Sequence, residues 1–569
     1  MEQNNKFMLK MKMINQRRHE TLNMTGLTRF KLRNELAEIV SCLTIFLCVL
    51  VCAPVAAQTK STSEHSNNSM MQLVETSANT LGGADKIRAL HNLTLQGYAQ
   101  YAYMWGGGNI TASPDAPQKW MAANDLQRIW DFDNDIFQLK ERRNMLFPFA
   151  ALFGHAFFPV NQVLDHNISY DKLADGKFAR IGEFEQNPLF IDGTRVRKLW
   201  SLTNPVSLLH AILTNKVTVT DLHKKNNLLL LTIQADKDVT LVLALDSTTK
   251  IPVSVQWSTP QNNLGEVRFT TTFIGYMPFD GIMLPMGYNT KMDFRDIVYF
   301  KMYVDGYRIN TAVENLKTPE SIRNAEVPVE KAPVIEVENV GKGVWRLTGG
   351  TTVVEFKDHL LLFELYGSQI LAKAIIEKAN TLVPNKKATE LIVSHHHFDH
   401  TAGFRAGVAA GLKVYSSRAN EGILREMAER PTPHFADVLR GNNKFKFVPV
   451  DQHLALSDGS TTLDIYHVIS NNHMADAVFA YIPAQHLMIE GDIGTAASDW
   501  QLWPESYTDN LKFYGITVDK ISPVHEKVMT HSELLQFIEA GRQRAIKRGM
   551  DYQKMNEYLP GYPIFEPNK

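Results

Sequence analysis

The fold of the C-terminal half is decided by residues 391–400, which read Leu-Ile-Val-Ser-His-His-His-Phe-Asp-His. The branched apolar residues at the start of this stretch are typical of a buried strand. Side chains two positions apart in extended backbone point the same way, so we expect His395 and His397 to converge on one metal ion. His396 then points away. Asp399 and His400 follow where the chain bends, and we expect them to serve a second metal ion beside the first.

Imidazole and carboxylate groups form a ligand set that suits zinc, and also iron or manganese. A cluster of histidines can instead be a surface tract or a tag. This cluster stands at the end of an apolar run and has further candidate ligands downstream, which favours the metal site.

Three of these further candidates come directly after predicted strands. His473 follows the alternating run 463–469, and Asp492 follows the apolar run 487–490. His525 follows another short apolar run. One carboxylate can bridge two metal ions, and Asp492 is the candidate for that position. The sequence therefore predicts ligands that are far apart in the chain but meet at strand ends.

Two other histidines are rival ligands. His467 lies within a predicted strand and can replace His473, and His531 lies at a predicted helix start and can replace His525. A histidine inside a strand is typical of the core or its rim, so we favour His473 and His525.

The pattern His395-x-His397-x-Asp399-His400 resembles the HxHxDH signature of the metallo-β-lactamase fold superfamily. The later candidates occur in the order of that superfamily, so the resemblance covers roughly residues 334–546. It implies an α/β fold, an αββα metallo-β-lactamase sandwich, and a site with two zinc ions. The ligands that the resemblance implies are His395, His397 and His473 on one metal ion, Asp399, His400 and His525 on the other, and Asp492 between them.

The last motif departs from the Pro-Gly-His-Gly that is usual in the superfamily. This chain has Pro523-Val524-His525-Glu526, so both glycines are replaced. The departure leaves open whether this loop holds the second metal ion. No cysteine replaces a ligand, which argues against the subgroups that use a thiolate.

The N-terminus predicts a targeting segment. Eight basic residues precede an uncharged apolar run from Ile39 to Ala57, and small residues close that run. We expect cleavage after Ala57 and export to a bacterial periplasm or secretion. The alternative is a membrane anchor at residues 39–57, because the run is almost long enough to span a bilayer. All 3 cysteines lie in this run, so the mature chain would contain no disulfide.

The first half of the chain is largely β-patterned. Strand-like runs include 93–98, 228–233, 240–245, 253–257 and 267–273. Strand following strand predicts an antiparallel sheet. A phenylalanine-rich stretch, residues 146–163, can be helical and either line an apolar cavity or belong to an ordinary core.

Two pieces of this half loosely resemble the curved half-barrel of periplasmic lipoprotein-carrier-like domains. One runs from Leu81-Gly82-Gly83 through residues 93–97, and the other is residues 279–285 followed by 299–309. The resemblance implies only a fold, but it raises the possibility of an acyl or lipid-like ligand.

The sequence thus predicts a domain order with the following limits. The segments are a signal peptide or anchor (1–57), a disordered tether (58–71), a β-rich N-terminal domain (72–312), a linker (313–333), a metallo-β-lactamase-like catalytic domain (334–550) and a tail (551–569). A short helix is expected near residues 73–81.

The resemblance implies a hydrolase in which a metal-bridged hydroxide, oriented by Asp399, attacks an ester, lactone, β-lactam or similar bond of a small molecule. Two alternatives stay open: an iron-dependent redox enzyme on the same fold, and a lipid- or acyl-binding protein with a secondary metal site. The formal net charge of -1 gives no electrostatic case for nucleic acid. Membrane contact is expected only through an uncleaved N-terminal segment, and the sequence does not indicate an oligomeric state.

Overall fold

The computed structural model describes residues 58–104, 111–145, 158–187, 190–331, 333–430, 432, 439, 443–471, 473–494 and 505–547. The predicted targeting segment, the tail and most of the phenylalanine-rich stretch lie outside these residues. The chain divides into two compact units, Met1–Ser66 and Asn67–Lys569. In the described part of the chain, no helix combines the length and apolar character needed to cross a membrane.

The segment predicted as a disordered tether, residues 58–71, is helical, so that prediction is wrong. Helix α2 spans Gln58–Thr80. Its sequence is polar but contains no glycine or proline that would break a helix. Met70, Val74 and Ala78 are buried at intervals of four residues, which places them on one face of the helix. Packing of this face stabilises the second half of the helix. A second helix, α3 (Ala84–Arg88), follows.

The first half of the chain forms one large antiparallel sheet, as predicted. The order of its strands is β6-β5-β4-β3-β2-β1-β15-β14-β13-β12-β11-β10-β9. These strands are β1 Asn92–Ala102, β2 Trp120–Asp131, β3 Ile136–Met145, β4 Phe158–Asp165, β5 Ile168–Lys172, β6 Phe178–Ile181, β9 Thr218–Lys225, β10 Leu228–Asp236, β11 Val239–Asp246, β12 Pro252–Gln261, β13 Gly265–Phe279, β14 Ile282–Met292 and β15 Val298–Ile309. The strands β1 to β6 and β9 to β15 each form a run of sequence neighbours, β1 pairs with β15 to join the two runs, and β6 and β9 lie at opposite edges of the sheet.

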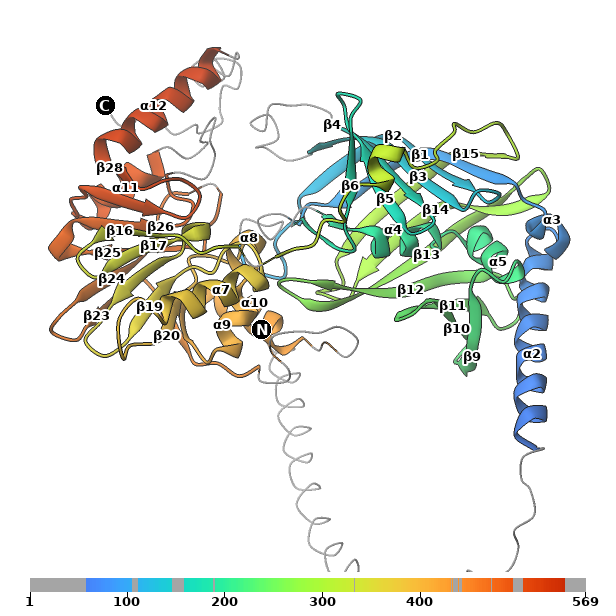
Figure 1. The fold of residues 1–569 in the computed structure, drawn as a ribbon, viewed down its shortest axis with the longest axis horizontal. Coiled ribbons are helices and arrows are strands. Elements are labelled where there is room, and N and C mark those ends of the chain that lie inside the picture. Colours follow the sequence, from blue (N-terminus) through green and yellow to red (C-terminus); the bar gives the residue numbers. More distant parts are fainter. Residues whose placement is uncertain are drawn as a thin grey trace, which may run out of the picture. The chain divides into compact units, whose positions relative to one another are not determined.

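Two helices and a small hairpin interrupt this meander between β6 and β9. The hairpin is β7 (Glu185–Asn187) with β8 (Phe190–Asp192), and the helices are α4 (Thr194–Ser201) and α5 (Pro205–Leu213). Helix α5 is buried along its whole length, and α4 places Trp200 against Trp257 and Phe300 of the sheet, with ring centroids 5.4 and 5.5 Å apart. These helices therefore close the core on one face of the large sheet (Figure 1).

The predicted linker is partly packed against the first sheet. Leu316 and Ile322 are buried together with residues of β3, β4 and β5, and Ile322 belongs to the short helix α6 (Glu320–Arg323). The backbone N–H and the hydroxyl of Thr318 both donate to Asp165 Oδ2, at 2.7 and 2.6 Å. This segment therefore leaves the first sheet along a fixed path.

The second half of the chain forms two further sheets. The first contains β16 Val337–Gly341, β17 Val344–Leu347, β18 Thr352–Glu355, β19 Leu360–Phe363, β20 Ala388–Ile392, β21 Lys413–Ser417 and β22 Phe447–Val450, in that order. The other contains β23 His453–Ser457, β24 Thr462–His467, β25 Val478–Ile482, β26 Leu487–Glu490, β27 Lys520–Pro523 and β28 Met529–Thr530. Strands β19 to β22 run parallel, as do β26 and β27.

Alternate side chains of these strands enter different cores. Leu361 and Ile392 of the first sheet share one core with Ile465 and Ile489 of the other. Because side chains of a strand alternate between faces, the neighbouring residue Leu391 enters the core that also contains helix residues. The two sheets thus pack face to face through one set of side chains.

Helices cover the outer faces of the two sheets. The helices near the first sheet are α7 Gln369–Ala379, α8 Phe398–Thr401, α9 Phe404–Ala409 and α10 Glu421–Glu429, and those near the other are α11 Glu505–Tyr514 and α12 His531–Lys547. Ile375 of α7 shares a core with Leu391, whereas Leu534 of α12 shares a core with Phe479 and Met488. Figure 1 shows the two groups of helices apart from each other.

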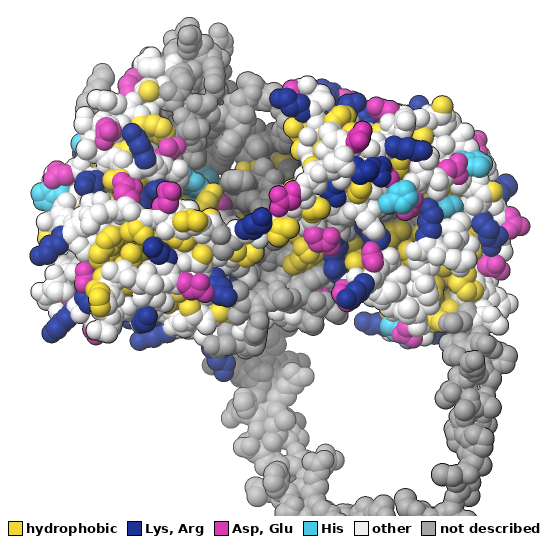
Figure 2. Space-filling view, viewed as in Figure 1, with side chains coloured by type: hydrophobic (Ala, Val, Ile, Leu, Met, Phe, Trp, Pro, Cys, Tyr) yellow, Lys and Arg dark blue, Asp and Glu magenta, His cyan; other side chains and the backbone are white. Residues whose placement is uncertain are grey.

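The surface shown in Figure 2 carries basic and acidic side chains that are interspersed.

The hairpin between β12 and β13 contacts the histidine-rich stretch directly. Asn263 at its tip is 1% exposed and donates from Nδ2 to the Phe398 carbonyl at 2.7 Å and to Thr401 Oγ1 at 2.8 Å. Arg430 reaches back to Asp293 with an Nη2–Oδ1 distance of 2.6 Å. The large sheet therefore supports the turn that carries the candidate ligands.

Replacing Asn263 with alanine removes both bonds and leaves the buried Phe398 carbonyl without this donor. We expect a loss of about 1–3 kcal/mol in the free energy of unfolding, measured by thermal unfolding. Asn262→Ala is the matched control, because Asn262 uses only its backbone carbonyl to accept from Gln369. Equal stability of the two variants would contradict this role of Asn263.

Candidate metal centre

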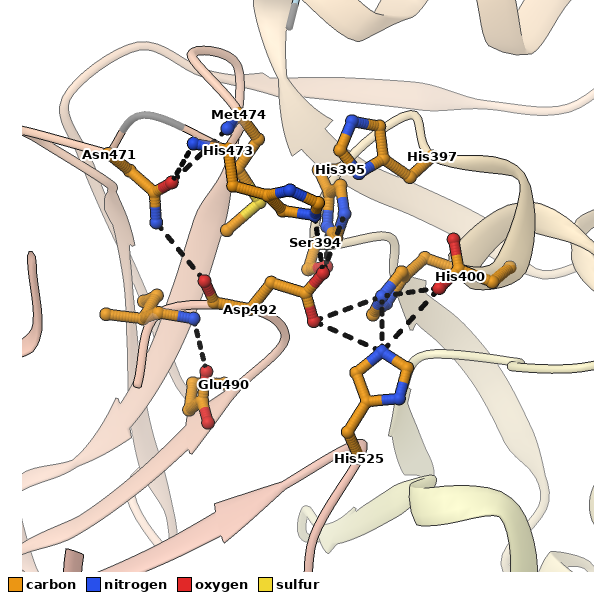
Figure 3. A network of polar contacts seen from close by, with 12 residues as sticks. Ser394, His395, His397, His400, Asn471, His473, Met474, Glu490, Asp492 and His525 are labelled. Atoms are coloured by element: carbon orange, nitrogen blue, oxygen red, sulfur yellow. Dashed lines mark hydrogen bonds and ion pairs between the residues drawn. The ribbon is translucent and has the colours of Figure 1, made fainter. Parts of the chain in front are cut away.

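The candidate ligands lie beyond the carboxyl ends of strands. Strand β20 leads to His395 and His397, β26 leads to Asp492, and β27 leads to His525. His473 lies in the connection from β24 to β25. Figure 3 shows these side chains pointing toward one another from separate elements. The structure therefore brings together residues that the sequence separates by up to 130 positions, from His395 to His525.

Four of the side chains form the first cluster. His395, His397, His473 and Asp492 each offer one ligand atom, and these atoms all lie within 4.8 Å of one another. His473 Nε2 lies 2.9 Å from Asp492 Oδ2, and His395 Nε2 lies 3.7 Å from the same oxygen. One carboxylate oxygen thus faces the three imidazoles.

The second cluster lies on the other side of Asp492. Asp399, His400 and His525 offer atoms within 4.8 Å of one another. Asp492 Oδ1 lies 3.3 Å from His400 Nε2 and 3.2 Å from His525 Nε2. Asp399 Oδ2 is 3.5 Å from the His400 nitrogen and 3.6 Å from the His525 nitrogen. Each oxygen of Asp492 therefore belongs to a different cluster.

The buried atoms of these clusters fit a metal ion. His395 and His397 are completely buried, and Asp399 is 3% exposed. Among the residues that the structure describes, His395 Nε2 and Asp399 Oδ1 have no hydrogen-bond partner. Burying such atoms without a partner is costly, and nitrogen and carboxylate oxygen are the donors that zinc, iron and manganese accept.

The pKa shifts of the cluster residues also fit a metal site. Burial lowers the pKa of His395 well below its usual value, so its imidazole is neutral, as a ligand must be. Burial alone would lower the pKa of His400, but Asp492 and Asp399 outweigh it and raise this pKa. Burial would raise the pKa of Asp492, but His400 and His525 hold it well below the ordinary range. The carboxylates therefore require nearby positive charge.

Glu364 and Ser394 support the clusters, and the sequence analysis missed both. Glu364 follows β19, is completely buried and has a left-handed backbone with φ of 68°. Its Oε1 accepts from the backbone N–H of Ser394 at 2.7 Å, and its Oε2 lies 3.6 Å from His400 Nδ1. Ser394 Oγ lies 2.8 Å from His395 Nδ1. An acidic residue at the end of the apolar run 360–363 was the signal that could have identified Glu364.

The loop that carries His525 is held by residues from the other sheet. Arg346 of β17 donates to the carbonyls of Pro523 and Glu526, at 3.2 and 2.6 Å. Gly350 provides room for the Val524 carbonyl, since a Cβ at this position would lie 2.1 Å from that oxygen. The missing glycines of the last motif are thus compensated by Arg346 and Gly350, and His525 reaches the second cluster.

The two rival histidines lie outside the clusters. Within the described part of the chain, neither His467 nor His531 belongs to a group that could hold a metal ion. His531 Nδ1 instead lies 2.8 Å from the hydroxyl of Tyr507, which is completely buried in the core beneath α12. Tyr507 is therefore a core residue.

Two side chains of the large sheet lie within electrostatic reach of the clusters. Tyr103 is 5% exposed, and burial and the charge of Asp399 raise its pKa. Burial lowers the pKa of Lys119 to about 8, and the charge of Lys119 adds to the burial that lowers the pKa of His397. The Tyr103 N–H donates to the Lys119 carbonyl at 2.8 Å, and the two residues directly follow β1 and precede β2, which are neighbours in the sheet. The sequence around Tyr103 and Lys119 did not indicate that these residues lie near the clusters.

Comparison with known proteins gives similarity in structure only. No protein-family model matches the sequence, and no curated protein matches it. A metallo-beta-lactamase from Pontibacter korlensis is 17% identical to this chain, with a TM-score of 0.30. The match covers 37% of this chain and 99% of that protein. A metallo-beta-lactamase from Hirschia baltica is 14% identical to this chain, with a TM-score of 0.28. The match covers 36% of this chain and 97% of that protein. The solved structures that resemble this chain thus include several metallo-β-lactamases.

Gly350→Ala tests how the His525 loop is held. A Cβ would displace the Val524 carbonyl, and φ of +80° adds backbone strain. We expect the variant to bind about one metal ion fewer per chain than the wild type, measured by elemental analysis. Gly343→Ala is the control, since Gly343 also has a positive φ of +67° but faces only the flexible side chain of Glu355. Full metal content in the Gly350 variant would refute the role given to this glycine.

Proposed function

We propose that this protein is a metal-dependent hydrolase with a dinuclear zinc centre of the metallo-β-lactamase type. The observation that carries the proposal is the position of Asp492, whose Oδ2 faces His395 and His473 while its Oδ1 faces His400 and His525. The succession of helices, two sheets and helices corresponds to the αββα sandwich of that superfamily. We retain zinc as the expected metal and iron or manganese as alternatives.

The residues divide into three roles. His395, His397 and His473 would hold one metal ion, and Asp399, His400 and His525 would hold the other, with Asp492 shared. Bound metal ions would supply a water molecule with a pKa near 7 and would polarise the bond under attack. We assign to Asp399 the orientation of the attacking water. Its carboxylate belongs to the second cluster, and its buried Oδ1 accepts no hydrogen bond from the residues that the structure describes.

We propose small-molecule esters, lactones, β-lactams or related compounds as substrates, and export as the setting of the reaction. Hydrolysis requires only that a carbonyl or similar group reaches the shared face of the two clusters. The charge of Asp399 contributes to the raised pKa of Tyr103, and the charge of Lys119 contributes to the lowered pKa of His397. Residues of the first half of the chain therefore lie within electrostatic range of the clusters.

Alanine at His395 or Asp399 removes one donor from a buried cluster. We expect His395→Ala to lose at least one metal ion per chain and to reduce hydrolysis at least a hundredfold, and Asp399→Ala to reduce hydrolysis similarly. Elemental analysis and a panel of a cephalosporin, a homoserine lactone, a thioester, an aryl sulfate and a phosphodiester measure both effects.

The controls are the rival histidines, because His467→Gln and His531→Gln leave the seven donors in place. Both should keep their metal. Metal content and activity that persist in His395→Ala and Asp399→Ala would overturn the assignment. One iron per chain without hydrolysis would favour the redox alternative.

Removal of metal should also destabilise the fold. The buried donors lose their common partner, and a ligand present at a hundred to a thousand times its Kd stabilises by about 3–4 kcal/mol. We expect a chelator to lower the unfolding temperature of the wild type, and zinc to restore it. His395→Ala should show a much smaller shift. An unfolding temperature that the chelator leaves unchanged would argue against a metal centre in these clusters.

A further inference from the structure

A buried histidine in the first half of the chain is far in sequence from the metal centre and takes no part in it. His210 is the one ionisable residue of helix α5, and it is 4% exposed. Its ring stacks on Phe132, with centroids 4.1 Å apart. Within the described part of the chain, the backbone carbonyl of His210 accepts from Thr214, but the ring nitrogens form no hydrogen bond. The imidazole can therefore still donate one hydrogen bond and accept another.

A cavity of about 240 Å³ opens beside this ring. An apolar cavity of about 150 Å³ is large enough to hold benzene, so this one has room for a benzene ring with a substituent. Its inner wall contains the buried side chains of Trp130, Phe137, Leu164 and Leu202. Exposed residues also line it, so the cavity is accessible from solvent; they are Asp135, His166, Asn167 and Lys216.

The two lysines that line the cavity are already paired with carboxylates. Lys216 Nζ lies 2.9 Å from Asp135 Oδ1, and Lys198 Nζ lies 2.7 Å from Asp236 Oδ2. Burial lowers the pKa of His210 to about 4, so its imidazole is neutral at pH 7. An anionic ligand would find no unmatched positive charge here, which favours an uncharged ligand.

The uncharged polar groups of the inner wall also have partners within the protein. Trp130 Nε1 and Ser207 Oγ both donate to the Ser201 carbonyl, at 2.7 and 2.8 Å. The Ser201 hydroxyl donates to the Lys198 carbonyl at 2.8 Å. The imidazole of His210 is thus the polar group of this wall that a ligand can use.

The aromatic residues of the wall favour an aromatic ligand. The rings of Trp130 and Phe137 lie 5.4 Å apart at an angle of 46°, and Phe132 lies beside His210. Aromatic rings gain from offset or edge-to-face packing against another ring, in addition to the area that they bury.

We propose that this cavity binds an uncharged aromatic compound with a single hydrogen-bonding group, such as a phenol, and that this group pairs with the imidazole of His210. The apolar wall takes up the ring, and the hydroxyl satisfies the buried nitrogen. The proposal is independent of the hydrolase proposal, since every residue that carries it belongs to the first half of the chain.

The test uses the full chain, with phenol and toluene as probes at pH 7. Because phenols can also bind metal ions, calorimetric titrations are made on the wild type and on His395→Ala. We expect phenol to bind saturably, and with equal affinity, to both. His210→Phe should bind phenol about fivefold more weakly, because it cannot form the hydrogen bond, and should bind toluene as well as the wild type does.

Two further variants keep the result decisive. His223→Phe makes the same substitution at an exposed histidine of β9 and should bind phenol like the wild type. Ala211→Met places a longer side chain in the cavity, which Ala211 lines, and should abolish the binding of both probes. An unchanged near-ultraviolet circular dichroism spectrum verifies that each variant is folded.

Three results would overturn the proposal. They are the lack of saturable phenol binding to the wild type, wild-type affinity in folded Ala211→Met, and loss of phenol binding in His395→Ala. A ratio of phenol to toluene affinity that His210→Phe leaves unchanged would overturn the role of His210. Hexanol that binds as tightly as phenol would overturn the choice of an aromatic ligand.

Discussion

Seven imidazole and carboxylate side chains converge in the C-terminal half, five of them buried and His473 and His525 half-buried, and this constraint governs that half of the structure. Isolated buried donors of this kind destabilise a fold unless a cation satisfies them. The strands deliver the donors to a common edge, and Asp492 faces both groups of imidazoles. Under the proposed function, part of the stability of the fold depends on bound metal.

The supporting residues come from elements that are distant in the chain. Glu364 and Ser394 fix the orientation of His400 and His395, whereas Arg346 and Gly350 hold the loop of His525. Asn263 of the large sheet supports the turn after the histidines. Because each support comes from a different strand or hairpin, the precise positions of the ligands depend on the whole tertiary structure rather than on one motif.

The residues that cluster in the candidate metal centre could be predicted from sequence, and their supports could not. Strand ends and donor chemistry are local signals, so they identified His395, Asp492 and the antiparallel first sheet. The compensation for the missing glycines beside His525 is not local, because it depends on residues about 175 positions earlier. The helix over residues 58–71 was not predicted because this segment is polar and has no apolar periodicity that would indicate a helix.

Anomalous diffraction from crystals of the metal-loaded protein tests the central claim most directly. The account predicts two peaks at the absorption edge of the bound metal, one beside each oxygen of Asp492 and about 3.5–4 Å apart. The imidazoles of His395, His397 and His473 should surround one peak, and those of His400 and His525 the other. A metal ion bound elsewhere, or no peak beside Asp492 in crystals grown with metal, would contradict it.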